Sequence, residues 1–474
     1  MSRESAIEDA LSAFDGGAFL EDLARRVAIP TESQNPDRLP DLYRYLGEEI
    51  QPAFEAMGFS CQVFDNPCQG AGPILLARRI EDPQLPTVLG YGHGDVIRGY
   101  EDQWREGLSP WAIVREGDRV YGRGTADNKG QHLIHMRSLA SVLKIRGCLG
   151  FNCKFLIETG EENGCKGLDE VVAGHRQAFA ADGFIASDGP RVDQARPNLT
   201  LGNRGAINFD LICDLREGGH HSGNWGGLLA NPGIILAHAL ASITTARGQI
   251  LIPDWLPVPI SNSVREALKH VVRDEGEMAP QADPQWGEPN LTGPQKVYGW
   301  NSFEVLAFRT GNPDNPVNAI PPRAWAHCQI RYVVGSKPDR FIPALREHLD
   351  AHGFEQVVIE PPPEGNAAGF EAARTDPDHP WARWVADSVS RTTGEETVIL
   401  PNSGGSICNA IFQDHLDVPT IWIPHSYGGC CQHAPNEHIL MSISREATAI
   451  TTGVYWDLGE QPPPKKIADS EWEG

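Results

Sequence analysis

The sequence of 474 residues lacks a run of 18 apolar residues anywhere along its length. We therefore expect no segment that spans a bilayer, and the acidic, amphipathic N-terminus has no apolar core of the kind a signal peptide needs. The chain also lacks a basic excess, since 40 Lys and Arg stand against 63 Asp and Glu and the formal net charge is −23. A surface of that sign repels nucleic acids and anionic membranes, so neither is expected as a partner.

Cysteine is sparse, and no internal repeat of fixed period is present. The ten cysteines are scattered and include no CxxC pair. Cys430 and Cys431 are adjacent in sequence and therefore poorly placed to bridge each other. This usage excludes a disulfide scaffold and favours a reduced, cytoplasmic setting.

The composition is that of a soluble protein with a well-formed core. Hydrophobic residues make up 40% of the chain and charged residues 22%. A chain of this length is too long for one ordinary domain, so we expect two or three.

Segments of strand type alternate with segments of helix type over residues 1–204. Apolar residues spaced by three to four predict the helices, and short apolar runs rich in β-branched residues predict the strands. Such alternation is typical of an α/β domain whose sheet is mostly parallel and flanked by helices. The predicted helices cover 5–30, 38–58 and 128–147, and the predicted strands cover 74–80, 87–93, 151–160 and 183–189.

The pattern changes at Gly205, where AINFDLICDL alternates with the period of two that a half-solvated strand shows. We expect residues 205–370 to form an inserted α+β domain, with two helices on an antiparallel sheet. Residues 371–474 then complete the first domain, and their tail 460–474 is expected to be disordered. The inserted helices are predicted at 231–243 and 339–353, and two of the inserted strands at 324–335 and 355–360.

Five short segments of the predicted α/β domain carry side chains that often bind metal ions. Alternate residues of a strand share a face, so the imidazole of His93 and the carboxylate of Asp95 can meet. Asp127 precedes a predicted helix, and its carboxylate has two oxygens that can serve two cations at once. The five segments are His93-Gly94-Asp95, Asp127, Glu161-Glu162, Asp188 and His433.

Each segment alone has an ordinary explanation, such as a strand-end turn, a helix N-cap or a solvated pair of glutamates. Together they place two imidazoles and several carboxylates at the ends of strands, where α/β enzymes build their sites. Two Zn²⁺ ions that share a carboxylate and a water need this set of ligands. The sequence therefore predicts a dinuclear hydrolase, in which one of the paired glutamates stays free to accept a proton.

The motifs GHGDVI, GRGTADNKG, ETGEENG, SDG and QHAPNE run over essentially the whole chain. In this order they resemble the dinuclear zinc peptidase and deacylase family of carnosinases, bacterial dipeptidases, glutamate carboxypeptidases, acetylornithine deacetylases and aminoacylases. The resemblance implies that His93 and Asp188 bind one Zn²⁺. It implies that Glu162 and His433 bind the other, with Asp127 as the bridge.

The resemblance also implies roles around these ligands. Asp95 would steady His93, and Glu161 would be the general base that deprotonates a metal-bound water. The peptide bond between Asp127 and Asn128 would be cis. Mn²⁺ or Co²⁺ could replace zinc in the cell.

Further matches fall in the inserted domain, which the resemblance makes a lid that pairs two subunits into a homodimer. HSGNWGGLLANP contains His221, which would reach the other subunit's site and polarise the scissile carbonyl. PVNAIPPRAWAHCQIR supplies Asn318 and Arg331, and the guanidinium of Arg331 suits a free carboxylate on the substrate. Outside the inserted domain, SGGSIC (403–408) supplies Gly405 and Ser406, whose backbone groups would bind the same carboxylate.

The chain departs from the family pattern at several positions. Asp188 stands where acetylornithine deacetylase-like members usually carry glutamate, which favours the dipeptidase and carnosinase side. Cys165 replaces a frequent serine after the paired glutamates. Cys430 and Cys431 lie just before His433, where a thiolate could compete for zinc unless both are structural thiols.

These observations lead to one main hypothesis and two alternatives. The main hypothesis is a cytoplasmic zinc-dependent hydrolase that cleaves the amide bond of a dipeptide, a C-terminal amino acid or an N-acyl amino acid. Its small-molecule substrate would carry a free carboxylate, and Glu161 would be the general base. The first alternative is a C–N hydrolase that acts on a non-peptide small molecule. The second is a metal-binding protein without catalysis, against which the intact Glu161 and the full ligand set argue.

Overall fold

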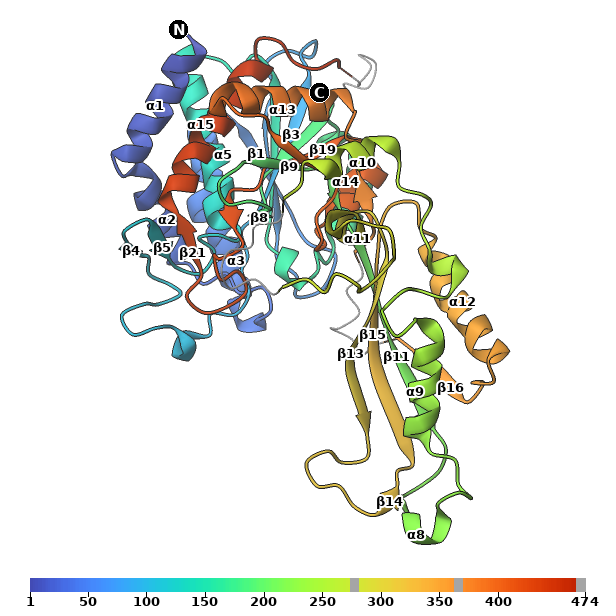
Figure 1. Cartoon of the computed structure of the whole chain (residues 1–474). Helices are drawn as coiled ribbons and strands as arrows, with labels where there is room; N and C mark the ends of the chain where they lie inside the picture. The colour runs from blue at the N-terminus through green and yellow to red at the C-terminus, as the bar shows by residue number, and fades with distance from the viewer. Residues whose placement is uncertain (273–280, 362–369, 466–474) are drawn as a thin grey trace.

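The computed structural model describes residues 1–272, 281–361 and 370–465. They form a larger unit, which holds both the first and the last helix, and a smaller elongated unit that projects from it (Figure 1). Within the described ranges, no helix combines the length and the hydropathy needed to cross a bilayer. The division of the chain at 204/205 and 370/371 remains a prediction.

Eight strands make up the main sheet of the larger unit: β1 (Ser60–Phe64), β2 (Ile74–Arg79), β3 (Thr87–His93), β6 (Asn152–Glu158), β7 (Gly183–Ala186), β9 (Asn198–Thr200), β18 (Val398–Leu400) and β19 (Thr420–Trp422). Their order is β1-β2-β6-β3-β7-β19-β9-β18. The central strands β6, β3, β7 and β19 are parallel to one another, whereas β1 and β2 are antiparallel additions at one edge. The prediction of a mostly parallel sheet is confirmed, and strands from both ends of the chain share it.

Helices cover both faces of this sheet, because alternate residues of its buried strands point to opposite sides. Val88 of β3 and Phe155 of β6 belong to one hydrophobic core, and their neighbours Leu89 and Leu156 belong to another. The helices of this unit include α1 (Arg3–Asp15), α2 (Ala18–Val27), α3 (Leu39–Tyr45), α4 (Gln51–Ala56), α5 (Lys129–Arg146), α6 (Leu168–Gly174), α7 (Arg176–Phe179), α13 (Pro380–Thr393), α14 (Asn409–Leu416) and α15 (Met441–Leu458). Helix α10 (Asn262–Lys269) also packs here, against β18.

One predicted helix is wrong in its continuity. The segment 5–30 is two helices, α1 and α2, because the chain turns at Gly17, whose φ of 93° lies in the left-handed region. The spacing of apolar residues did not show this turn. The predicted helix 38–58 is confirmed, since α3, a π-helical turn η2 (Leu46–Ile50) and α4 follow one another without a break in the helical backbone.

The smaller unit has a four-stranded antiparallel sheet in the order β13-β15-β11-β16, whose strands are β11 (Gly205–Asp214), β13 (Ser302–Thr310), β15 (Arg323–Tyr332) and β16 (Val357–Glu360). Helices α9 (Pro232–Ile243) and α12 (Pro338–Ala351) pack against it in one hydrophobic core (Figure 1). Trp255 lies fully buried in that core. The unit is therefore two helices on an antiparallel sheet.

The alternation of buried and solvent-exposed residues that the sequence predicted for β11 is wrong. Most of β11 is buried, because it is an inner strand and Asp210 on its outer face is covered. The Oδ2 of Asp210 accepts a hydrogen bond of 2.8 Å from the indole of Trp325, and its Oδ1 lies 2.6 Å from Nδ1 of His327. A clean alternation appears instead on the neighbouring strand β15.

The tail 460–474 was predicted to be disordered, and residues 466–474 lie outside the described residues. Before them, the carbonyl of Gln461 accepts a hydrogen bond of 2.7 Å from the indole of Trp384. The remaining elements used below are β12 (His220–His221), α8 (Ser222–Trp225), β14 (Ala319–Ile320) and the 3₁₀ turn η4 (Glu161–Asn163).

Candidate active site

The predicted ligands gather at one edge of the main sheet. Strand β3 ends at His93, β6 leads into Glu161 and Glu162 of η4, and β7 leads to Asp188. These three strands are adjacent and parallel, so their carboxyl ends meet, which is where α/β folds place their sites.

The first group of ligand atoms consists of His93, Asp127 and Asp188, all buried. The Nε2 of His93 lies 2.9 Å from Oδ1 of Asp127 and 3.8 Å from Oδ2 of Asp188. The other ring nitrogen, Nδ1, lies 3.1 Å from the backbone oxygen of Asp95 and 3.5 Å from its carboxylate. This is the way a metal-binding histidine is usually oriented.

The second group consists of Asp127, Glu162 and His433. The Nε2 of His433 lies 3.1 Å from Oδ2 of Asp127 and 2.9 Å from Oε2 of Glu162. In each group the ligand atoms lie within 4.8 Å of one another, and Asp127 belongs to both. The structure thus brings together all five predicted metal ligands in the expected two sets.

The site concentrates buried carboxylates, whose negative charges bound cations would neutralise. Burial, and then the charge of Asp127, raise the pKa of Glu162 to about 8 and that of Asp188 to about 6. Burial opposes ionisation of Asp127 as well, but its hydrogen bonds with His433 and His93 hold its pKa well below the usual range. Carboxylates crowded in this way repel one another, and divalent cations between them would remove the repulsion. The residues present therefore fit a pair of metal ions.

Both imidazoles hold their protons tightly in the metal-free chain. Hydrogen bonds with Asp127 and Glu162 raise the pKa of His433 to about 11. Burial disfavours the charge on His93, yet its contacts with Asp127 and Asp95 raise its pKa well above the usual value. A metal must displace these protons, so metal binding will be stronger at higher pH.

Asp95 supports the general-base candidate as well as His93. Its Oδ1 accepts the backbone N–H of Glu161 at 3.2 Å, and its Oδ2 accepts that of Glu162 at 3.1 Å. This fixes the turn η4 beside β3. Glu161 is partly exposed, and the burial it does have raises its pKa well above the ordinary value.

One residue that the sequence reasoning missed is Glu437, which is buried and positions the loop before Asp127. Its Oε1 accepts the backbone N–H groups of Gly124, Ala126 and Asp127 at 3.0, 3.0 and 3.1 Å. Its Oε2 accepts a hydrogen bond of 2.8 Å from Nη1 of Arg123. The only signal in the sequence was its place at the end of the QHAPNE motif.

The peptide bond between Asp127 and Asn128 is cis, as the resemblance implied. The side-chain amide of Asn128 donates to the carbonyl of Ser187 at 2.8 Å. The amide of Gln432 donates to Oδ2 of Asp127 at 2.5 Å. These contacts connect Asn128 to the loop after β7 and the carboxylate of Asp127 to the loop of His433.

A cavity of about 580 Å³ opens beside the ligands, and its lining includes Glu161, His433, Gly405 and Ser406. Arg331 reaches Ser406 from the smaller unit, with Nη1 of Arg331 2.9 Å from Oγ of Ser406. Burial lowers the pKa of Arg331 below its usual value. Three of the predicted substrate-binding residues thus lie around the cavity or in contact with its lining.

His221 and Asn318 are placed elsewhere. The N–H of Ser222, next to His221, donates to the carbonyl of Asn318 at 2.9 Å. Both residues therefore lie together where α8 and β14 form the far tip of the smaller unit (Figure 1). Within one chain the structure does not bring them to the ligands.

Residues 89–456 match the family model described as Peptidase family M20/M25/M40. The chain belongs to this family. Beta-Ala-His dipeptidase of Mus musculus is 32% identical, over 94% of this chain and 93% of that protein. Cys-Gly metallodipeptidase DUG1 of Candida albicans is 26% identical, over 90% and 91%. The crystal structure of human carnosine dipeptidase 1 superimposes with a TM-score of 0.71 at 22% identity, over 97% of this chain and 100% of that one.

This M20 chain is a metal-dependent peptidase, as its named relatives are metallodipeptidases. The predicted family is confirmed, including its dipeptidase and carnosinase side. Of the two thiols that precede His433, Cys430 is buried, and burial raises its pKa to about 12. The Cys430 thiol therefore stays protonated at neutral pH, which argues for a structural role there.

Proposed function

We propose that this M20 peptidase hydrolyses the amide bond of a dipeptide and that its native cofactors are two Zn²⁺ ions. The observation that carries the proposal is the pair of ligand groups that share Asp127. Imidazole and carboxylate ligands suit Zn²⁺, and the same set also accepts Mn²⁺ or Co²⁺. The dipeptidase names of relatives that cover nearly the whole chain support the substrate class.

In this proposal His93, Asp127 and Asp188 hold one cation, and Asp127, Glu162 and His433 hold the other. When bound, the two cations supply Lewis acidity that lowers the pKa of a water and polarises the scissile carbonyl.

Glu161 moves the proton of the reaction. It accepts a proton from the attacking water and returns it to the leaving amine, for which its raised pKa suits it. Asp95 holds the backbone of Glu161 and Glu162 in place, so the base and a metal ligand keep a fixed separation. Hydrolysis of the amide bond releases two products, an amine and a carboxylic acid.

The free carboxylate of a dipeptide would bind at the opposite end of the cavity. Arg331 offers a guanidinium there, and the loop of Gly405 and Ser406 offers backbone donors. A substrate anchored at this end presents its amide bond toward the ligands. This arrangement favours substrates with a free C-terminal carboxylate.

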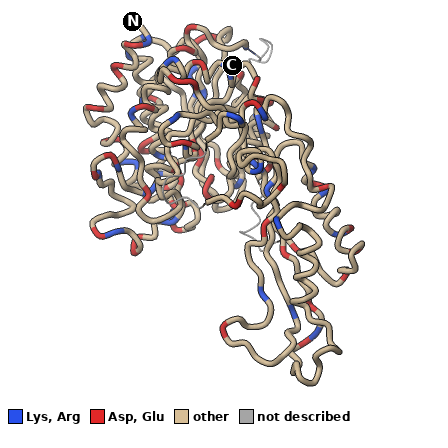
Figure 2. The backbone as a smooth tube through the Cα atoms, in the orientation of Figure 1, with Lys and Arg blue, Asp and Glu red and all other residues tan. Residues whose placement is uncertain are grey.

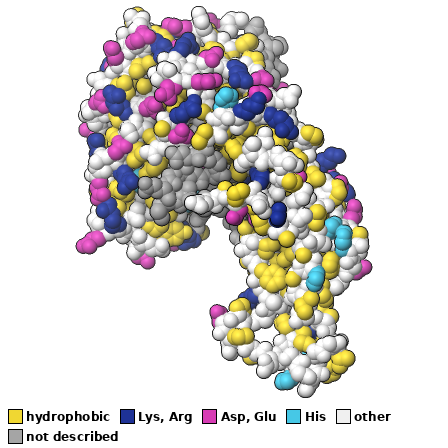
Figure 3. Space-filling model, in the orientation of Figure 1, with side chains coloured by type: hydrophobic (Ala, Val, Ile, Leu, Met, Phe, Trp, Pro, Cys, Tyr) yellow, Lys and Arg dark blue, Asp and Glu magenta, His cyan; other side chains and the backbone are white. Residues whose placement is uncertain are grey.

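We further infer a homodimer formed through the smaller unit, in which His221 serves the other subunit's site. Helix α9 carries no charged residue and is tan throughout in Figure 2, and Ile234 on it is 60% exposed. Leu306 on the edge strand β13 is 55% exposed, and hydrophobic side chains gather on this unit in Figure 3. An uncovered sheet edge beside an apolar helix is typical of a surface that pairs with a second copy.

The same proposal places the enzyme in the cytoplasm. All ten cysteines are free thiols. Free thiols are usual in reducing compartments, whereas small secreted proteins rely on disulfides.

The test is an assay of the metal-loaded protein on β-alanyl-histidine and cysteinyl-glycine, read by release of the free amine. Activity should disappear with a chelator and return with Zn²⁺. Glu161→Gln should lower kcat by about 10²- to 10⁴-fold, while the metal content stays unchanged. Glu170→Gln, at an exposed position on α6, is the matched control. Turnover retained by Glu161→Gln would remove the mechanism, and hydrolysis limited to amides without a carboxylate would remove the dipeptide proposal.

A further inference from the structure

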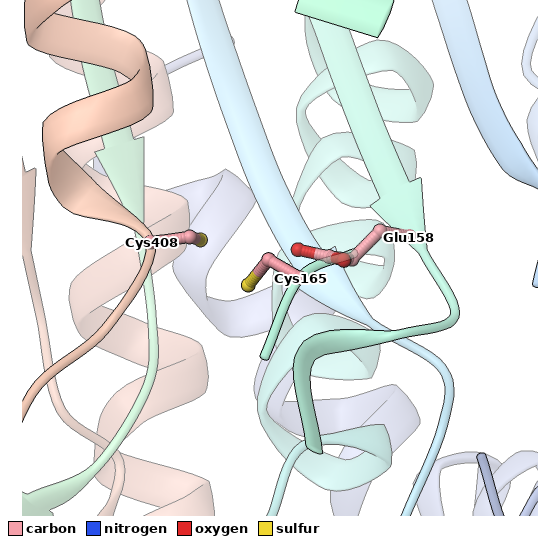
Figure 4. Close-up of side chains that lie close together, drawn as sticks. All are labelled: Glu158, Cys165 and Cys408. Carbon is pink, nitrogen blue, oxygen red and sulfur yellow. The ribbon is translucent and has the colours of Figure 1, made fainter. Parts of the chain in front are cut away.

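A third group of metal-type ligands lies outside the site described above. It consists of Glu158, Cys165 and Cys408, which are 2%, 5% and 2% exposed. Figure 4 shows their side chains converging from the end of β6, from the loop after η4 and from the start of α14. One ligand atom of each lies within 4.8 Å of the other two.

The spacing of these atoms is close to that of a metal site. In a tetrahedral zinc site, Zn–S distances of about 2.3 Å and Zn–O distances of about 2.0–2.2 Å separate neighbouring ligand atoms by roughly 3.4–3.8 Å. The three side chains therefore need to contract only slightly around a cation. Two thiolates also select a soft cation over Mg²⁺ or Ca²⁺.

Glu158 accepts a neutral hydrogen bond in this cluster, from the hydroxyl of Tyr91 to its Oε1 at 2.6 Å. Among the residues that the structure describes, no cationic side chain forms a salt bridge with Glu158, although the charge of His93 acts on it from beyond that distance. Burial raises the pKa of the Cys165 thiol well above its usual value. A bound divalent cation would compensate the charges of the carboxylate and the thiolates and replace the thiol protons.

We propose that Glu158, Cys165 and Cys408 form a third metal site, which binds a thiophilic divalent cation such as Zn²⁺ or Cd²⁺. Binding displaces the two thiol protons to solvent and leaves the oxidation states of metal and sulfur unchanged. The carboxylate of Glu158 lies together with the two sulfurs, which favours a metal site over a disulfide, because a disulfide needs no carboxylate. The site is separate from the two ligand groups that share Asp127 and does not depend on the proposed dipeptidase activity.

The position of this site gives it a structural consequence. Cys165 follows Glu162 by three residues, and Cys408 follows Ser406 by two. A cation held by both cysteines therefore fastens the turn of the general-base candidate to the loop that lines the substrate end of the cavity.

The test is a Cd²⁺ titration of the metal-loaded, reduced full chain carrying Cys431→Ser, which removes the exposed thiol near His433. Cadmium bound by thiolate gives a charge-transfer band in the ultraviolet, which imidazole and carboxylate ligands do not give. We expect one additional equivalent of Cd²⁺, the band and release of protons. Cys165→Ser and Cys408→Ala should lose the band, while Cys153→Ala, at a buried cysteine on the same strand as Glu158, should keep it.

Three results would overturn the proposal: no band in the Cys431→Ser protein, a band that survives in both cluster variants, or a Cys165–Cys408 disulfide in the protein as isolated. The X-ray absorption spectrum of the added cation in the Cys431→Ser protein reports its sulfur and oxygen neighbours directly, so the test stands even if a cluster variant fails to fold. Two sulfurs and at least one oxygen are expected, and a shell without sulfur contradicts the site.

Discussion

Arg331 and Ser406 join the two units of this peptidase at the metal-site cavity. Nη1 of Arg331 donates to Oγ of Ser406 at 2.9 Å, and that hydroxyl donates to the carbonyl of Arg204 at 2.8 Å. The Nε of Arg331 is bound to Gln329 at 2.9 Å, which fixes the plane of the guanidinium. Among the residues that the structure describes, its other N–H groups have no further hydrogen-bond partner. In the proposed function they would pair with an anion, so that the smaller unit would contribute a charge to a site built on the larger one.

Arg331→Ala should weaken the binding of substrates that carry a free carboxylate. A hydrogen-bonded charge pair contributes about 1.5–3 kcal/mol, so we expect KM for such dipeptides to rise roughly 10- to 100-fold. Dipeptides amidated at the C-terminus should show no comparable change. Arg323→Ala, at an exposed position on the same strand, is the control. Equal losses on both substrate sets would show that Arg331 holds the fold and does not recognise the carboxylate.

Glu437→Gln should weaken metal binding, although Glu437 touches no metal ligand side chain. Both oxygens of Glu437 accept N–H groups, so an amide NH₂ at either position faces another donor and releases the loop that carries Asp127. Residues that orient metal ligands in this way contribute about 10- to 100-fold in metal affinity. Competition with a chromophoric chelator measures the change, with Glu395→Gln at an exposed position as the control. Unchanged affinity would contradict this positioning role.

The sequence predicted those parts of the site that depend on local pattern. His93, Glu161 and Asp188 follow apolar strands, and parallel strands end at a common edge, so their convergence could be expected. The antiparallel direction of the edge strands β1 and β2 could not be predicted in this way, because a strand's direction in a sheet depends on its partners and not on its own residues.

Contacts between distant segments could not be predicted from the sequence. Glu437 reaches Asp127 from 310 positions away, and its role as an acceptor for three backbone N–H groups leaves no periodic signal. The same applies to Glu158, Cys165 and Cys408, whose separation in sequence hides their convergence. The resemblance named His221 but gave no indication that it lies at the tip of the smaller unit beside Asn318.

Stability should fall on acidification because of the buried His135. Its ring nitrogens lie 2.6 Å from the hydroxyls of Tyr455 and Ser187, and burial lowers its pKa to about 3. The unfolded chain takes up this proton near pH 6.5 and the folded chain only near pH 3, so stability is lost as pH falls through that window. We expect His135 alone to contribute a loss of about 2 kcal/mol by pH 5.

Urea unfolding of the metal-free protein at pH 7 and pH 5 measures this loss. His135→Gln should be less stable than the wild type at pH 7 and should lose the pH-dependent part. His270→Gln removes an exposed histidine and is the control. An identical pH dependence in His135→Gln and the wild type would assign the acid sensitivity to other groups.

The proposed homodimer, in which His221 serves the other subunit's site, predicts that two inactive variants will restore each other. Nδ1 of His221 accepts the N–H of Gly223 at 3.1 Å, which leaves Nε2–H as a donor for a carbonyl oxygen. In a dimer of His221→Ala and Glu161→Gln chains, one site has an intact Glu161 and receives His221 from the other subunit. Mixing the two proteins under conditions that exchange subunits should therefore recover activity. A mixture of Glu161→Gln with Asp127→Asn, both damaged in the same site, should stay inactive. Mixed dimers that form without any recovery would show that His221 does not act across the interface.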